Sequence, residues 1–466
     1  MLIVMKFGGS SVGDAEALRN VVSLISDYSS ANDLVVVASA MNGVTNSLIK
    51  AAARASQRDE NHVVEVAEKL RIRHQNVCQQ TIRNPDEAER TMARIEGELK
   101  ELEKALTGIS YLGELTPRSQ DYVLSFGEKL STLVLTGALR ASGIDAERLT
   151  GEEAGIVTDA SFGDAMPLVE ITQARLNERL HPLIKNGKTP IVTGYIAATK
   201  EGIPTTLGRG GSDYTATIIG SAIGADEVWI WTDVDGIMTA DPKIEQAAKT
   251  IREISHMEAI EMSHFGAKAM HPRALEPAAK TGLPVRVKNT FNPKGPDTLI
   301  LQDQRIKSVH IVKAVTSVRE ASMVTVNGAG MHGAPGTAAR VLDALGRSDI
   351  DILMISQSSS EANISLVIAR QNLEKAIVAL RESLLKEGFF REITSEADVS
   401  IVAAVGAGMK GTPGIAARLF RAVADRGVNV KMIAQGSSEL NISFLVREDD
   451  LLNSVHTLHE EFQLGD

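Results

Sequence analysis

The sequence has little cysteine, few aromatic residues and no surplus of positive charge. Its single cysteine, Cys78, excludes an intramolecular disulfide, and a lone thiol is more typical of a packed interior than of a nucleophile. Aromatic residues make up 4% of the chain, and the formal net charge is −10 at pH 7. Both values argue against a general nucleic-acid binder, which needs surplus lysine and arginine and aromatic platforms for bases. We therefore expect small-molecule chemistry.

The sequence also lacks long apolar runs. No uninterrupted stretch approaches the ~18 residues that a membrane-spanning helix needs, and the apolar segment before Lys6 is too short for a signal peptide. These absences predict a cytoplasmic protein with neither a membrane nor a nucleic acid as partner. The chain of 466 residues exceeds the roughly 250–300 residues at which single cores stop growing, so several domains are expected.

Short apolar runs alternate with helical patterns in the first part of the chain. The runs are rich in valine and isoleucine, as buried parallel strands are, and they cover residues 34–40, 189–197, 227–234 and 283–289. Residues 121–143 show apolar positions at helical spacing and end at a glycine. This alternation predicts an α/β fold, an αβα sandwich with a mainly parallel central sheet.

The last third of the chain contains a repeat. Residues 327–345 match 405–423, and residues 355–368 match 433–446, with a constant offset of 78 residues. Each copy shows the order strand, glycine-rich turn, helix, strand, turn and strand, followed by a further helical stretch, which indicates a ferredoxin-like βαββαβ fold. We interpret the repeat as a paired regulatory module. A purely structural pair that serves dimerisation is the alternative.

The first glycine-rich segment, MKFGGSSVG, places Lys6 before Gly8 and Gly9. This order is the reverse of the P-loop, in which the lysine follows the glycines. A lysine at the tip of a strand, close to backbone N–H groups that glycine leaves accessible, suits a phosphate. By itself the signal is weak, because a strand followed by a glycine-rich turn is usually only a turn.

The second glycine-rich segment, TTLGRGGSDYTA at residues 205–216, surrounds Arg209 with three glycines. Ser212 and Asp213 follow where a helix is expected to begin, and a serine cap and a first-turn aspartate stabilise any helix. Capping does not explain the glycines. A loop of this kind lets the backbone approach a ligand closely, while the guanidinium of Arg209 offers a planar fork to a carboxylate or phosphate.

The motifs of the whole chain resemble, in order and spacing, those of the aspartokinases in the amino acid kinase superfamily. They read MKFGGSSVG, VVVASAMNGVTN, SFGEKLS, TTLGRGGSDYTA, WTDVDGIMTADP and MSHFGAKAMHP. The repeat resembles the ACT domains of the same enzymes. The resemblance implies an amino acid kinase domain over residues 1–305, a first ACT domain over 306–392 and a second over 393–466.

The resemblance also implies a reaction. ATP would phosphorylate the side-chain carboxylate of L-aspartate to give 4-phospho-L-aspartate, the first step towards lysine, threonine, methionine and isoleucine. Mg²⁺ would arrive with the nucleotide, held mainly by its phosphates, because the sequence shows no spacing of carboxylates typical of a dedicated cage. A kinase that acts on a related acceptor and an amino-acid sensor with an inactive kinase domain remain as alternatives.

By resemblance, several residues would bind the acceptor. Glu128 would meet the α-amino group of aspartate, and Arg209 would hold its α-carboxylate, with Ser212 close by. Ser39 and Thr45 would contact the aspartate or the phosphates, although the sequence alone favours a helix cap for each of them.

By the same resemblance, other residues would serve the nucleotide. Lys6 would lie against the transferring phosphoryl group, Gly8 and Gly9 would supply N–H donors, and Asp213 would orient the lysine. Asp213 is not expected to act as a base, because an acceptor carboxylate has no proton to lose at pH 7. The remaining nucleotide contacts implied are Thr232, Asp233, Met238, Lys243 and Lys268.

Two positions of the kinase domain depart from the family pattern, and a third has an alternative interpretation. Met238 and Lys243 stand where many relatives have a tyrosine and an arginine, so base stacking or a phosphate contact is expected to differ there. His271 could suggest acid–base catalysis, but next to Pro272 we expect it to end a helix.

The ACT resemblance implies an amino-acid effector, with threonine favoured over lysine, and a homodimer or higher assembly. Since the chain ends after the second copy, we expect no fused homoserine dehydrogenase. The expected effector residues have polar side chains at equivalent places in the two copies: Gln357, Ser359, Glu361 and Asn363 in the first, and Gln435, Ser437, Glu439 and Asn441 in the second.

Overall fold

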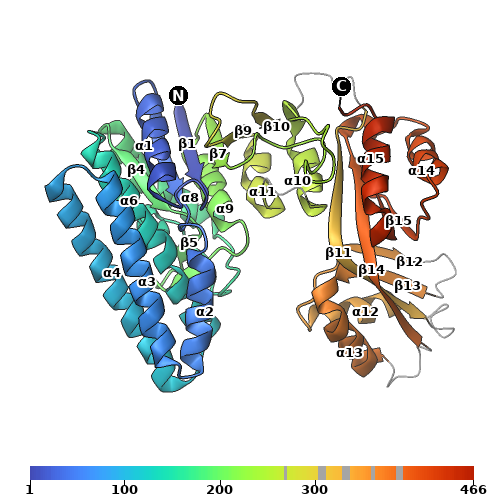
Figure 1. Ribbon diagram of the computed structural model, residues 1–466, viewed down its shortest axis with the longest axis horizontal. Helices are drawn as coiled ribbons and strands as arrows, with labels where there is room; N and C mark the ends of the chain where they lie inside the picture. Colours follow the sequence, from blue (N-terminus) through green and yellow to red (C-terminus); the bar gives the residue numbers. More distant parts are fainter. Residues whose placement is uncertain (267–269, 303–310, 328–335, 358–362, 385–391, 466) are drawn as a thin grey trace. The chain divides into compact units, whose positions relative to one another are not determined.

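The computed structural model describes residues 1–266, 270–302, 311–327, 336–357, 363–384 and 392–465. They form two compact units, each of which is described by itself (Figure 1). The first unit consists of Met1–Ile237, Arg252–His256 and Ala269–Gln304, and the second of Met238–Ile251, Met257–Lys268 and Arg305–Asp466.

An eight-stranded sheet lies at the centre of the first unit, in the order β3-β4-β2-β1-β7-β9-β10-β8. All pairs from β3 to β9 are parallel, and β10 joins β9 in antiparallel orientation. The predicted α/β fold with a mainly parallel sheet is therefore confirmed. The strands are β1 (Leu2–Phe7), β2 (Asp33–Ala38), β3 (Ala146–Leu149), β4 (Thr189–Thr193), β7 (Glu227–Thr232), β8 (Glu253–Ser255), β9 (Val285–Asn289) and β10 (Thr298–Leu301).

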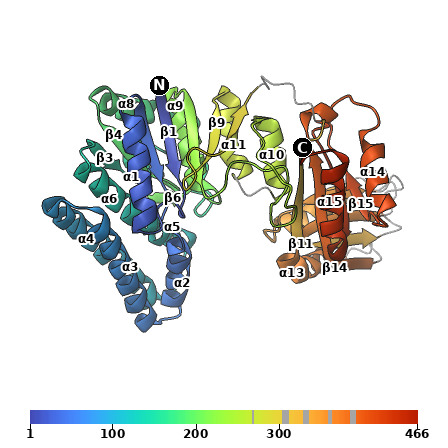
Figure 2. The ribbon, with the colours of Figure 1, turned by 45° about the horizontal axis from the view of Figure 1, so that its top comes forward.

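Helices cover both faces of this sheet (Figures 1 and 2). They are α1 (Ala15–Ser29), α2 (Val44–Ser56), α3 (Glu60–Thr81), α4 (Pro85–Leu112), α5 (Pro117–Leu124), α6 (Phe126–Ala141), α7 (Gly151–Ala154), α8 (Val169–Lys185), α9 (Gly211–Ile223) and α11 (Pro272–Thr281). The helical pattern of residues 121–143 is divided between α5 and α6 at Ser125, whose hydroxyl donates to the carbonyl of Tyr122. Cys78 is buried in α3, which agrees with the prediction that this lone thiol belongs to a packed interior.

The alternation of side chains along β1 decides where Lys6 points. Ile3, Met5 and Phe7 belong to the core cluster that includes residues of α1 and α6. Val4 faces the opposite side, where it lies close to Gly220 of α9. Because successive side chains of a strand alternate between faces, Lys6 shares the face of Val4 and points to the side of the sheet that α9 covers.

A six-stranded sheet forms the second unit, in the order β12-β13-β11-β14-β16-β15. All of its pairs are antiparallel. The strands are β11 (Ala314–Asn327), β12 (Met354–Gln357), β13 (Asn363–Ala369), β14 (Glu392–Val405), β15 (Met432–Ala434) and β16 (Asn441–Arg447). The helices are α12 (Thr337–Gly346), α13 (Leu373–Leu384), α14 (Ile415–Asp425), α15 (Leu451–Glu461) and, from Met257 onward, α10 (His256–His264).

The two copies of the repeat exchange strand segments. Residues 323–327 of β11 pair with 392–396 of β14, and residues 314–318 pair with 401–405. The first ferredoxin-like set therefore takes its last strand from the start of β14. The second set takes its last strand from the start of β11, which lies at the beginning of the first copy. The helices follow this division, since one cluster joins Val315 to α14 and α15, and another joins Val326 to α12 and α13.

Candidate active site

Four parallel strands of the first unit, β4, β2, β1 and β7, end at the same edge of the sheet. The carboxyl ends of parallel strands are where open α/β sheets bind their ligands. Backbone hydrogen bonds join the segments that follow these strands to neighbouring strand ends, from Gly8 to Trp231 at 3.2 Å, from Ser39 to Phe7 at 3.1 Å and from Gly194 to Ala38 at 2.9 Å. The sequence-predicted residues around Lys6, Ser39 and Thr232 are thus brought to one edge.

The central feature of this edge is an ion pair between Lys6 and Asp213. The Nζ of Lys6 lies 2.5 Å from Oδ1 of Asp213, and the two side chains are only 10% and 13% exposed. Lys6 comes from the end of β1, and Asp213 from the first turn of α9. The carboxylate therefore holds the ammonium group in place, and the role of Asp213 in a reaction stays a prediction.

The glycine turn after β1 offers backbone donors next to Lys6. The N–H of Gly8 is donated to the carbonyl of Trp231, so it is not free to meet a ligand. The N–H groups of Gly9 and Ser10 have no acceptor within the described part of the chain. A Cβ at Gly9 would lie 2.9 Å from the carbonyl oxygen of Ala40, so no other residue fits there without a shift. The open donors are thus one residue further along the chain than expected.

The glycine-rich loop before α9 has a left-handed backbone at two of its glycines. Gly208 and Gly210 have φ angles of +70° and +69°, and a Cβ at Gly210 would clash with the side chain of His271. Arg209 between them is exposed, and it has no ion pair among the residues described. Its guanidinium is available to a carboxylate.

Gly210, and not Ser212, is the N-cap of α9. The expected serine cap is therefore wrong, because the left-handed loop brings the chain into the helix two residues earlier. No backbone acceptor for the N–H groups of Ser212 and Asp213 is present in the described ranges. The start of α9 consequently presents open N–H donors and the positive end of the helix dipole, which favours an anion.

Glu128 is a buried carboxyl group in the first turn of α6. It is 3% exposed, and burial raises its pKa to about 8, although the backbone N–H of Ala40 donates to it. One of its oxygens, Oε2, has no hydrogen-bond partner within the described residues. A buried carboxylate oxygen without a donor is costly unless a ligand supplies one. The ammonium group that was expected to meet Glu128 would supply such a donor.

Tyr195 is a residue of this site that the sequence analysis missed. It directly follows Gly194 after β4, and its φ of +66° is unusual for a residue with a side chain. Burial raises the pKa of Tyr195 to about 12, and the nearby charge of Glu128 acts in the same direction. Its ring also lies against Gly211 of the glycine-rich loop. The available signal was its place directly after Gly194, near the end of the apolar run 189–197.

Asp121 of α5 is a second residue that the sequence analysis missed. It is fully buried, and it accepts hydrogen bonds from the N–H of Gly163 at 2.9 Å and from the N–H and hydroxyl of Thr206 at 3.0 and 2.7 Å. Thr206 ends β6 (Pro204–Thr206), just before the glycine-rich loop. Burial raises the pKa of Asp121, while these hydrogen bonds favour its charged form. Asp121 therefore holds the strand from which the loop starts.

On the side of β7, two of the expected nucleotide contacts, Thr232 and Asp233, lie at the end of the strand and directly after it. Thr232 ends β7 and is half-buried, while Asp233 is exposed and accepts a hydrogen bond from the Thr232 hydroxyl at 3.2 Å. Thr232 also accepts the N–H of Thr290 at 2.9 Å. The buried hydroxyl of Thr290 lies 2.7 Å from that of Ser11, which links this strand end to the glycine turn after β1.

The other expected nucleotide contacts lie outside the first unit or outside the described residues. Met238 and Lys243 belong to the second unit, where the Met238 sulfur accepts a hydrogen bond from the Thr250 hydroxyl and the N–H of Lys243 is donated to Asp241. Lys268 lies outside the described residues, so its role stays a prediction.

Three residues interpreted from their local sequence are placed differently by the structure. Ser39 lies in the segment after β2, and Thr45 lies within the first turn of α2, whose N-cap is Gly43. The helix-cap interpretation is therefore wrong for both. His271 precedes α11 as its N-cap and does not end a helix, because Pro272 is accommodated at the first helical position, where its missing N–H costs nothing.

The expected effector residues of the second unit are only partly described. Gln357 ends β12, and Gln435 directly follows β15. The carboxylate of Glu439 accepts the N–H of Gly411 at 2.7 Å, and the buried Asn441 donates to Glu261. Asn363 begins β13, and Ser437 lies before β16; Ser359 and Glu361 lie outside the described residues.

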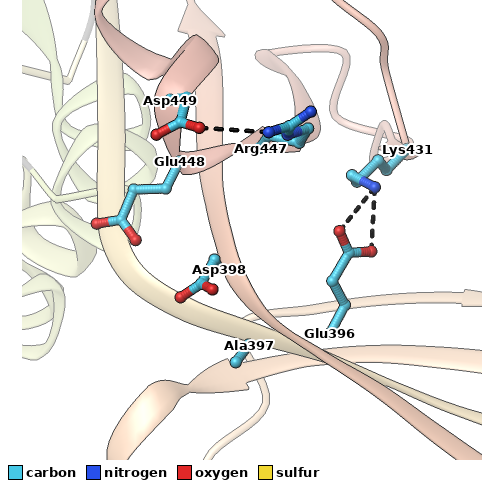
Figure 3. Close-up of a pocket in the computed structure, with 7 residues that line it drawn as sticks. All are labelled: Glu396, Ala397, Asp398, Lys431, Arg447, Glu448 and Asp449. Carbon is cyan, nitrogen blue, oxygen red and sulfur yellow. Dashed lines mark hydrogen bonds and ion pairs between the residues drawn. The ribbon is translucent and has the colours of Figure 1, made fainter.

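A cavity of about 550 Å³ lies at the junction of the two copies (Figure 3). Its lining is charged, but the charges are paired with one another. Lys431 lies 2.7 Å from Glu396, and Arg447 lies 3.3 Å from Asp449. Glu448 is paired with Arg370, its equivalent in the other copy at the offset of 78 residues. The cavity contains none of the expected effector residues.

The described residues were compared with the requirements of a metal site and of a membrane-spanning helix. Among the described residues, no group of three His, Cys, Asp or Glu side chains is placed to hold a metal ion. In the same residues, no helix combines the length and the apolar character needed to cross a membrane.

Comparison with known proteins identifies the family. The amino acid kinase family model matches residues 1–289, and an ACT domain model matches residues 324–384 and 402–462. Aspartokinase 1 of Arabidopsis thaliana is 35% identical over 98% of this chain and 80% of its own length. A bifunctional aspartokinase/homoserine dehydrogenase of Zea mays is 33% identical over 100% of this chain, which spans only 51% of that relative.

Solved structures agree with this result. E. coli aspartokinase III in complex with aspartate and ADP has a TM-score of 0.82 and 29% identity, with 99% of this chain and 100% of that chain covered. The same enzyme in complex with lysine and aspartate has a TM-score of 0.81 and 28% identity, with 99% of each chain covered. The chain therefore belongs to the amino acid kinase family, as a member of its aspartokinase group with C-terminal ACT domains.

Proposed function

We propose that the chain transfers the γ-phosphoryl group of ATP to the side-chain carboxylate of L-aspartate. The observation that carries this proposal is the buried pair of Lys6 and Asp213, next to the open N–H donors of Gly9, Ser10 and the start of α9. Phosphoryl transfer depends mainly on positioning and on charge stabilisation, and this edge of the sheet concentrates fixed positive charge and donors.

The acceptor would bind between Glu128 and Arg209. Its ammonium group would satisfy the unpartnered oxygen of Glu128, and its α-carboxylate would pair with the free guanidinium of Arg209. A carboxylate oxygen would then form a bond to the γ-phosphorus as the bond from that phosphorus to the bridging oxygen of ADP breaks. No base is needed, because the acceptor is already ionised at pH 7.

The nucleotide would lie on the side of Lys6 and β7. Lys6 would stabilise the charge of the transferring group, and Ser39, Thr45, Ser212, Thr232 and Asp233 would supply further contacts at the strand ends. When bound with ATP, Mg²⁺ would neutralise phosphate charge, and it would be held chiefly by the phosphates themselves. Segment 1–305 would thus carry the chemistry.

The acceptor specificity decides between this reaction and another amino acid kinase activity. ADP release with ATP and Mg²⁺ is measured with aspartate, glutamate and acetylglutamate in turn. Activity with aspartate alone supports the proposal. Activity with another acceptor only, or with none, contradicts it, and threonine binding in the absence of any activity would indicate a sensor.

We further propose that segments 306–392 and 393–466 bind an amino-acid effector, with threonine favoured, in a homo-oligomer. The polar groups around Gln357 and Gln435 support this role, and lysine is the ligand in the E. coli complex. Aspartate-dependent activity is measured with threonine and with lysine. Inhibition by threonine at lower concentration supports the proposal, whereas stronger inhibition by lysine contradicts the choice of effector. A cytoplasmic location stays a prediction.

A further inference from the structure

A cavity of about 320 Å³ lies between α4 and α6, away from the residues of the candidate active site. Each helix contributes positions spaced i, i+3, i+4 and i+7, which is the spacing of one helix face. The lining residues are Glu87, Arg90, Thr91, Ala93 and Arg94 of α4, and Leu133, Thr136, Gly137 and Arg140 of α6. Gly137 is nine residues along α6 from Glu128, or about 13 Å along the helix axis.

The charge of this cavity is unbalanced. It is lined by three arginines and one acidic residue, Glu87, which lies 3.7 Å from Arg140. Arg90 and Arg94 have no ion pair among the residues described. Arg94 also lies near Arg148, but the largely buried guanidinium of Arg148 is paired with Glu98 at 3.5 Å and is not part of this imbalance. The cavity of Figure 3 differs in this respect, because its cations are paired with its acids.

The floor of the cavity contains a second, independent feature. Thr91 is 3% exposed, yet its hydroxyl has no hydrogen-bond partner in the described part of the chain. A Cβ at Gly137 would clash with this hydroxyl, so the glycine gives the hydroxyl its space at the helix crossing. The hydroxyl oxygen itself is not enclosed by protein atoms, so it is open to the cavity and available to hydrogen-bond a ligand there.

We infer that this cavity binds a small anion that carries more than one carboxylate or phosphate group. Arg90, Arg94 and Arg140 supply planar donors that match such groups, and Thr91 supplies a hydroxyl at the base. The site is separate from Lys6 and from the glycine-rich loop. It does not depend on the proposed reaction.

The test uses the full chain and two probes, citrate and inorganic phosphate, at constant ionic strength set with chloride. Isothermal titration should show saturable binding of at least one probe, and the comparison of the two identifies the preferred chemistry. The variant Arg90→Ala/Arg94→Ala should bind at least tenfold more weakly, and Thr91→Val should bind severalfold more weakly. Lys6→Ala should retain the binding, since phosphate could otherwise report on the active site.

The matched control removes the same charge from the same helix outside the cavity. Lys100 and Lys104 are exposed on α4, and Lys100→Ala/Lys104→Ala should bind the probe as the unchanged chain does. The inference is overturned if neither probe shows saturable binding, if the lysine control loses as much affinity as the arginine variant, or if binding is lost only in Lys6→Ala.

Discussion

Replacement of Glu128 by glutamine should stabilise the first unit and weaken acceptor binding at the same time. The carboxyl group is buried with an unpartnered oxygen, and burial raises its pKa to about 8 from an ordinary value of 4.5. The folded chain therefore retains a proton that the unfolded chain loses. Because Glu128 ionises only in the unfolded chain between about pH 4.5 and about pH 8, the stability of the fold falls as the pH rises through this range.

The size of this effect follows from the two pKa values. At ~1.4 kcal/mol per pH unit, the cost is ~3 kcal/mol at pH 7 and approaches ~5 kcal/mol above pH 8. Glutamine has nearly the same shape and no charge, so Glu128→Gln removes this cost. For a domain of this size, a gain of ~3 kcal/mol corresponds to an increase in melting temperature on the order of 5 °C.

The assay is thermal unfolding of both proteins between pH 5 and pH 8.5, together with the KM for aspartate. The difference in melting temperature should be small at pH 5 and should grow towards pH 8, while the KM for aspartate rises in the variant. Glu178→Gln, at an exposed position of α8, serves as the control and should show neither change. A variant that melts lower than the unchanged chain at pH 8, or a difference that does not depend on pH, refutes the reasoning.

Three further substitutions test other parts of the structure. Arg209→Ala should raise the KM for aspartate roughly ten- to a hundredfold, because a charge-assisted pair with the α-carboxylate is lost, and should leave the KM for ATP within about twofold. Steady-state kinetics measures both constants. An unchanged KM for aspartate would show that Arg209 is not part of the acceptor site. Asp121→Asn loses acceptor capacity for the N–H of Gly163 and for Thr206. Chemical denaturation should therefore show a decrease in the free energy of unfolding on the order of 2 kcal/mol. An unaltered midpoint would show that Asp121 does not hold β6 in place. Gln435→Ala should weaken inhibition by the effector without a change in the basal rate, and undiminished sensitivity would exclude that residue.

Periodicity and composition were sufficient to predict the architecture of the first unit. The valine- and isoleucine-rich runs predicted β2, β4, β7 and β9 because buried parallel strands are apolar on both faces. The glycines around Arg209 predicted a loop whose backbone can approach a ligand closely, and the structure gives Gly208 and Gly210 positive φ angles. Local signals for helix ends were less reliable, because serine and proline each occur at several positions near the ends of helices. Ser212 lies inside α9 instead of capping it, and Pro272 begins α11 instead of following a helix.

Features that depend on distant contacts could not be predicted from the sequence. The constant offset revealed two copies, but the pairing of residues 314–318 with 401–405 joins segments far apart in the chain. The burial of Glu128 and the positive φ of Tyr195 likewise depend on how α6, β2 and β4 pack. Asp121 carries no local motif, since its partners lie 42 and 85 residues away.

The most direct test of the central claim is whether the chain forms an acyl phosphate on aspartate with the help of Lys6. The chain and its Lys6→Ala variant are incubated with ATP, Mg²⁺ and aspartate, and hydroxylamine traps any acyl phosphate as a hydroxamate. The account predicts aspartyl hydroxamate from the unchanged chain and a yield lower by roughly a hundredfold or more from the folded variant. No hydroxamate from the unchanged chain, or an equal yield from Lys6→Ala, would contradict it.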